Sequence, residues 1–75
     1  MRDDLLPPPR FGMVITRIGD PELVCFVLCG RPDRTARAVV LRSSSRVPLS
    51  PGALHTAVWH EAVWEVLYLG PEVEP

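Results

Sequence analysis

The sequence predicts an α+β domain in which a three-stranded antiparallel meander is followed by one C-terminal helix packed on one face of the sheet. Three apolar, β-branched runs come first and are separated by short turns that contain glycine and proline. A later segment has apolar residues at helical spacing, between a Ser-Pro start and a Gly-Pro stop. A length of 75 residues leaves room for one domain.

The strands are expected at residues 11–18, 23–29 and 36–42, joined by turns at 19–22 and 30–33. Turns this short connect antiparallel neighbours. The middle strand is apolar at consecutive positions, and consecutive side chains of a strand point to opposite faces. Both faces of the sheet therefore need cover, but one helix covers only one of them. A second copy of the chain or a foreign surface is expected over the other face, unless the two chain ends fold across it.

The helix is expected over residues 53–69. Ser50 and Pro51 suit a helix start, because serine caps free amides and proline fits the first turn. Gly70 and Pro71 supply the stop. The apolar face of this helix would consist of Val58, Trp59, Ala62, Val63, Val66 and Leu67.

An alternative places a fourth strand at residues 62–69, where Trp64, Val66 and Tyr68 occupy alternate positions. The fold would then be a small SH3-like β-barrel. The start and stop signals favour the helix.

Domain organisation follows from the position of the prolines and acids. Residues 1–10 form an extended arm with three consecutive prolines, residues 11–70 a single compact domain, and residues 71–75 an acidic tail. No apolar run reaches the roughly 18 residues of a membrane span, so we expect no membrane partner and a cytoplasmic location, or a place in a virion if the protein is viral. The size and composition fit phage or viral accessory proteins that decorate capsids or inhibit host factors.

Catalytic patterns are missing from the sequence. The serine run at residues 43–45 has no nucleophile-elbow glycines around it, and there is no phosphate-binding glycine loop. We therefore expect neither enzymatic activity nor a cofactor.

Two cysteines followed by two histidines resemble, in order and type, the Cys2His2 zinc site of a hairpin and helix. The residues are Cys25, Cys29, His55 and His60. Cysteines four apart in one strand lie about 13 Å from each other, which is too far to share a zinc ion without a break in the strand. A zinc-stabilised module is thus kept as a second alternative, and two buried thiols are the plainer interpretation.

Charge is unevenly distributed along a chain whose net charge is −1. Residues 31–46 contain one acid and five arginines, namely Arg31, Arg34, Arg37, Arg42 and Arg46. Arginine forks bind carboxylates or phosphates, so this segment predicts contact with an acidic protein or with nucleic acid. A dedicated nucleic-acid binder usually has a basic excess, so a nucleic-acid-binding module is the alternative rather than the leading hypothesis.

On the predicted helix, His60, Trp64 and Tyr68 form a stripe on the side away from the sheet. Tryptophan and tyrosine are favoured interface anchors, because they bury a large area and keep a polar group. The competing interpretation is that the prolines of the arm cover both rings. The leading hypothesis is therefore a non-enzymatic protein-interaction or assembly protein that binds another protein or a second copy of itself.

Overall fold

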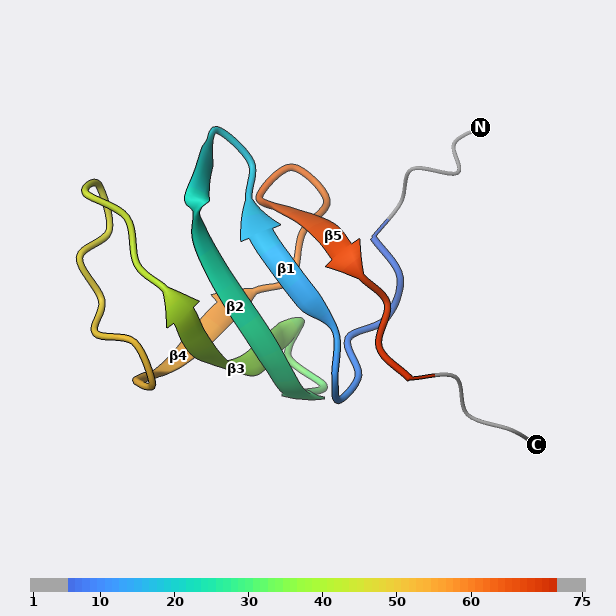
Figure 1. The fold of residues 1–75 in the computed structure, drawn as a ribbon. Coiled ribbons are helices and arrows are strands. Elements are labelled where there is room, and N and C mark those ends of the chain that lie inside the picture. The colour runs from blue at the N-terminus through green and yellow to red at the C-terminus, as the bar shows by residue number, and fades with distance from the viewer. Residues whose placement is uncertain (1–5, 72–75) are drawn as a thin grey trace.

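The computed structural model describes residues 6–71 as an all-β domain with five antiparallel strands in one strongly curved sheet (Figure 1). The strands are β1 (Val14–Arg17), β2 (Asp20–Gly30), β3 (Thr35–Arg42), β4 (Leu54–Val58) and β5 (Trp64–Tyr68). Their order in the sheet is β4-β3-β2-β1-β5. The described residues contain no helix, so the expected α+β class is wrong, and the SH3-like alternative fits better.

The first three strands form the meander that the turn signals predict. β1 pairs with β2 and β2 pairs with β3, both antiparallel. The first turn is tighter than expected, because Arg17 already lies opposite Asp20 and only Ile18 and Gly19 connect them. β2 is correspondingly long, with 11 residues.

The expected helix start is a reverse turn. Ala53 N donates to Ser50 O at 3.0 Å, and Gly52 has a φ of 89°. Proline at the second position and a positive-φ glycine at the third are the signature of a type II turn. A helix cannot begin through Gly52 in this conformation, so the Ser-Pro pair starts a turn into a strand.

The rest of the expected helix is two strands and the turn between them. β4 pairs with β3, and β5 returns to pair with β1 at the far side of the sheet. Between them Val63 N donates to His60 O at 2.9 Å. Within each of these strands, successive side chains point alternately inward and outward, with a period of two residues. The turn between the strands shifts the phase of this alternation. The apolar positions of the whole segment then imitate a helical period.

The core lies on the concave side of the sheet and draws on every strand. It consists of Met13, Ile15, Leu23, Cys25, Val27, Ala36, Ala38, Val40, Ala57 and Trp64. Trp64 is its largest side chain and is 2% exposed. Its ring nitrogen donates to Val58 O at 2.9 Å, so the buried polar group is satisfied. The three alanines of β3 and β4 offset the volume of the indole in this cluster.

The described part of the predicted arm, residues 6–10, lies against the domain. Pro9 is so close to β2 that a Cβ atom on Gly30 would lie 2.6 Å from its Cγ, which requires glycine at that position. Residues 1–5, and residues 72–75 of the predicted acidic tail, lie outside the described part of the chain. No helix among residues 6–71 has the length and apolarity needed to cross a membrane.

Replacing Trp64 by alanine is expected to lower the free energy of unfolding by about 3–5 kcal/mol, because it leaves a cavity in the core. Trp64→Phe, which keeps a ring but loses the hydrogen bond to Val58, should cost less. Urea denaturation followed by circular dichroism checks both values. An alanine variant as stable as the parent would contradict the placement of this ring in the core.

Candidate functional site

An open groove of about 730 Å³ lies where three separate segments meet. One wall is the arm, the second is the β2–β3 turn, and the third is the connection from β4 to β5. The lining residues are Leu6, Pro9, Arg31, Pro32, Arg34, Trp59, His60 and Glu61. The groove thus combines apolar walls with two arginines, a tryptophan and a histidine.

Trp59 is the fixed centre of this groove. It follows β4 directly, and its backbone N donates to Arg34 O at 2.9 Å. Its ring nitrogen donates to Pro7 O at 2.8 Å. The side chain is half-buried, so the ring is held from both ends while part of it stays exposed. An aromatic ring fixed in this way binds a ligand at a low cost in conformational entropy.

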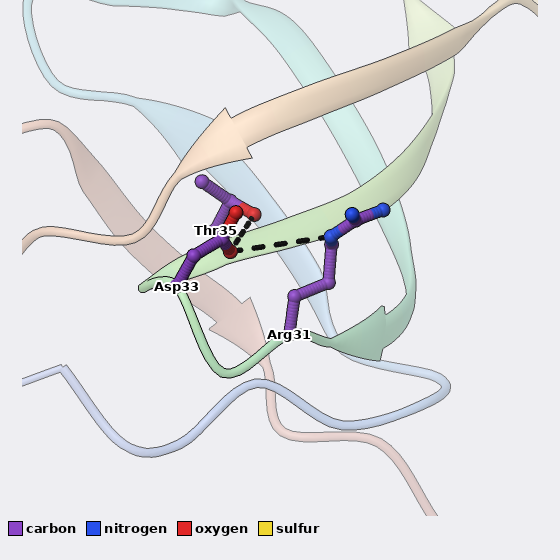
Figure 2. A network of polar contacts seen from close by, with 3 residues as sticks. All are labelled: Arg31, Asp33 and Thr35. Carbon is purple, nitrogen blue, oxygen red and sulfur yellow. Dashed lines mark hydrogen bonds and ion pairs between the residues drawn. The ribbon is translucent and has the colours of Figure 1, made fainter.

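The β2–β3 turn is ordered by a small polar network (Figure 2). Thr35 Oγ1 donates to Asp33 Oδ1 at 2.6 Å, and Arg31 Nε lies 4.0 Å from the same oxygen. The hydrogen bond from Thr35 is the main cause that lowers the pKa of Asp33, and the charge of Arg31 acts in the same direction. The carboxylate therefore stays ionised and steadies the loop that carries both groove arginines.

Arg34 has a φ of 65°, and it is the one residue other than glycine with a positive φ in the described chain. Long side chains rarely adopt this conformation, which costs on the order of 1 kcal/mol and favours glycine or asparagine. The conformation lets the Arg34 carbonyl accept from Trp59 while its side chain remains exposed. Backbone strain of this kind is often found at binding sites.

His60 and Glu61 close the groove at the β4–β5 turn. Ala62 N donates to His60 Nδ1 at 2.9 Å. An acceptor at Nδ1 places the proton of the neutral ring on Nε2, which is then a donor available to a ligand. Glu61 adds one negative charge to the rim, so the groove is cationic on the side of the β2–β3 turn and acidic on the other.

The predicted aromatic stripe does not exist, because its helix does not exist. Trp64 lies in the core, and Tyr68 is 55% exposed on the outer side of β5. His60 alone reaches the groove. The competing interpretation had the arm covering both rings. Trp64 is instead buried in the core, and the arm, which makes hydrogen bonds with Trp59 and Leu69, leaves more than half of the Tyr68 side chain exposed.

The five arginines do not form one patch. Arg31 and Arg34 line the groove at one end of the β2–β3 hairpin. Arg37 lies within β3, and Arg42 ends that strand and donates to the carbonyl of Glu22 at 3.0 Å. Arg46 is exposed in the loop that follows. The structure therefore brings together two of the five.

The four zinc-ligand candidates are also separated. Cys25 lies in the core and Cys29 is exposed near the end of β2. His55 lies edge-on to Trp64, where burial, with a contribution from the charge of Arg17, lowers its pKa. Among residues 6–71, no three histidine, cysteine or acidic side chains are close enough to hold a metal ion.

Sequence reasoning missed the residue at the centre of the groove. Trp59 was assigned to the core face of the expected helix, and Pro9 and Pro32 were interpreted only as arm and turn residues. The Trp-His-Glu run at residues 59–61 could have indicated an exposed connection, because it follows a strand and does not continue the alternation of apolar and polar residues.

Comparison of the chain with protein-family models, with curated proteins and with solved structures found no match. The function is therefore inferred from the chemistry of the groove.

We expect the two thiols to differ sharply in reactivity. Burial raises the pKa of Cys25 from 9.0 to about 11, and this side chain has no exposed surface, whereas Cys29 is exposed. At about pH 8, a disulfide reagent should label one thiol in the native protein and both in urea. The variant Cys29→Ser should show no rapid labelling; rapid labelling of it would contradict the burial of Cys25.

Arg34→Gly should be at least as stable as the parent, because relief of the positive φ offsets the greater freedom of the unfolded chain. Arg34→Ala removes the same guanidinium but keeps the strain. We expect the glycine variant to exceed the alanine variant by about 1 kcal/mol in free energy of unfolding, measured in urea. The reverse order would show that the backbone is not strained at this position.

Proposed function

We propose that the domain is a protein-interaction module whose groove binds an acidic, extended segment of a partner protein. The observation that carries this proposal is the placement of Arg31 and Arg34 beside the fixed ring of Trp59. Arginine binds carboxylates through two parallel hydrogen bonds, and tryptophan packs against proline or aliphatic side chains. A segment that alternates acidic and apolar residues matches both.

The groove is prepared for such a segment before it binds. The hydrogen bonds of Trp59 to Pro7 and Arg34, and the polar network around Asp33, hold the walls in place. A preformed site avoids the cost of ordering its own side chains on binding. The Nε2 of His60 offers a hydrogen-bond donor for a backbone carbonyl or a carboxylate.

Charge favours a protein partner over nucleic acid. Phosphate backbones are bound by a continuous basic track, but Arg42 and Arg46 lie far along the hairpin from the groove arginines. Glu61 in the groove and Asp33 beside it would repel consecutive phosphates. In the proposed partner segment, each carboxylate lies between apolar residues. It can therefore contact the two guanidinium groups with no second negative charge directly next to it.

The experiment uses a synthetic peptide of alternating glutamate and proline, titrated into isotopically labelled protein and followed by two-dimensional NMR. The indole N–H signal of Trp59 should shift, and the matched glutamine–proline peptide should leave it in place. Arg34→Gly is expected to weaken binding about tenfold or more while the protein stays folded. Arg46→Gly is the matched control, because it removes an exposed arginine outside the groove.

Two outcomes would contradict the proposal. One is an equal response to the acidic and the neutral peptide. The other is binding of a single-stranded oligonucleotide that is lost in Arg46→Gly and falls steeply with salt, since this would favour a nucleic-acid module along β3.

A further inference from the structure

The described arm, residues 6–10, lies against the domain without becoming a strand of the sheet. Within residues 6–71, no hydrogen bond between two backbone groups joins residues 6–9 to another segment. Three of these four residues are prolines, which have no N–H to donate. The segment is therefore held through side chains and single carbonyl groups, as a bound peptide is held.

The prolines fix the shape of the arm. The ring of a proline sets its own φ at about −65°, and the residue before a proline is confined to extended conformations. Leu6, Pro7 and Pro8 each precede a proline. Residues 6–9 therefore favour the polyproline conformation, which has about three residues per turn and no internal hydrogen bonds.

Burial along the arm follows this period. Leu6 and Pro9, which are three residues apart, are both partly buried, and so is Pro7. Pro8 and Arg10 are exposed. Proline-rich ligands of small binding domains lie along aromatic-lined grooves in the same conformation.

Trp59 and Gly30 form the surface on which the prolines lie. The ring nitrogen of Trp59 donates to Pro7 O at 2.8 Å. Gly30 leaves room for the ring of Pro9, because a Cβ atom on Gly30 would lie 2.6 Å from Pro9 Cγ. The surface thus combines an aromatic side chain, space for a proline ring, and a donor for a carbonyl that the polyproline conformation leaves free.

Two hollows border the arm. One is the groove of about 730 Å³, and the other is a cleft of about 310 Å³ lined by the prolines, Met13 and Leu69. The arm passes the end of β5, where Arg10 Nε donates to Leu69 O at 3.1 Å (Figure 1). Leu6 packs against the core cluster. The sheet pairs its five strands without the arm, so the arm can leave while the strands stay paired.

We infer that this surface is a polyproline-binding site that the chain's own arm fills, and that a proline-rich segment of a partner protein takes the place of the arm. The arm gives the chemistry of that segment, which is leucine, proline, any residue, proline and arginine. The inference goes beyond the proposed function. The acidic segment is bound by Arg31 and Arg34, whereas the proline-rich segment is bound by Gly30 and the ring nitrogen of Trp59.

The connection between the arm and β1 favours a foreign segment over the arm of a second copy. Gly12 N donates to Val27 O at 3.0 Å, and Met13 N donates to Arg10 O at 3.3 Å. These bonds keep the last residue of the arm on its own domain. An arm that reached a second copy would break them, but a free segment needs only the vacated surface.

Attachment makes the arm a strong competitor although its contacts are few. A segment tethered by a short linker has an effective concentration in the ~mM range. A free segment that makes the same contacts therefore binds the parent chain weakly, and it binds more tightly once the arm is weakened. The arm is thus a built-in inhibitor of its own site.

The test uses the peptide Leu-Pro-Pro-Pro-Arg with blocked ends and the isotopically labelled full chain. Pro9→Gly removes the ring that lies over Gly30 and loosens the arm, so a fluorescent form of the peptide should bind this variant about tenfold more tightly than the parent. In two-dimensional NMR, the indole N–H signal of Trp59 should move in the variant. The peptide should return it toward its parent position, because the same kind of carbonyl is supplied again.

Two variants are matched controls. Pro8→Gly adds the same backbone freedom to the arm but removes an exposed ring, so it should gain less affinity for the peptide than Pro9→Gly. Gly30→Ala dislodges the arm through a clash with Pro9, but it excludes the peptide's proline from the same place and should not bind the peptide. The indole N–H signal of Trp64, which is buried, reports that each variant stays folded.

Two results would overturn the inference. One is a folded Pro9→Gly variant that does not bind the peptide, because the arm would then be only a part of the fold. The other is a parent dimer in light scattering that Pro9→Gly dissociates, because the arm of a second copy would then be the ligand. The peptide carries no acidic group, so its binding does not depend on the groove arginines, and either proposal can fail without the other.

Discussion

The burial of Trp64 is the constraint on which the rest of the structure depends. Its indole enters the core at the first residue of β5 and donates to the carbonyl at the last residue of β4. The two strands are thereby joined at their ends, although they are the opposite edge strands of the same sheet. The short connection between them cannot move away from the domain, and it carries Trp59, His60 and Glu61. The groove therefore exists because a different tryptophan is fully buried.

The sequence was sufficient to predict the first three strands but not the last two. β1 to β3 are joined by short turns, so the information that specifies their pairing is local. β5 pairs with β1, which lies about fifty residues away in the chain. No local sequence pattern predicts a contact between residues so far apart. The phase shift at the β4–β5 turn then created a helical period by coincidence. The clearest local clue was Gly52, since Pro51-Gly52 is as good a turn signal as Ser50-Pro51 is a helix signal.

The candidate site was recovered in part, for the same reason. Arg31 and Arg34 could be selected as candidate binding residues, because clustered charge and turn residues can be recognised from the sequence alone. His60 lines the groove because of its place in the β4–β5 turn, and not because of a helical stripe. Trp64, which was expected on the outer stripe, is the buried ring, whereas Trp59, which was expected on the core face, is only partly buried against the core and also lines the groove. Which of two nearby tryptophans is buried depends on strand phase, and strand phase depends on the distant partner strand.

The two ends of β3 carry arginines with different surroundings. Arg34 precedes the strand and lines the groove, whereas Arg42 ends the strand and donates to the carbonyls of Glu22 and Pro21. Eight residues of extended chain separate these arginines by roughly 26 Å, so a ligand that fills the groove would contact Arg34 and not Arg42.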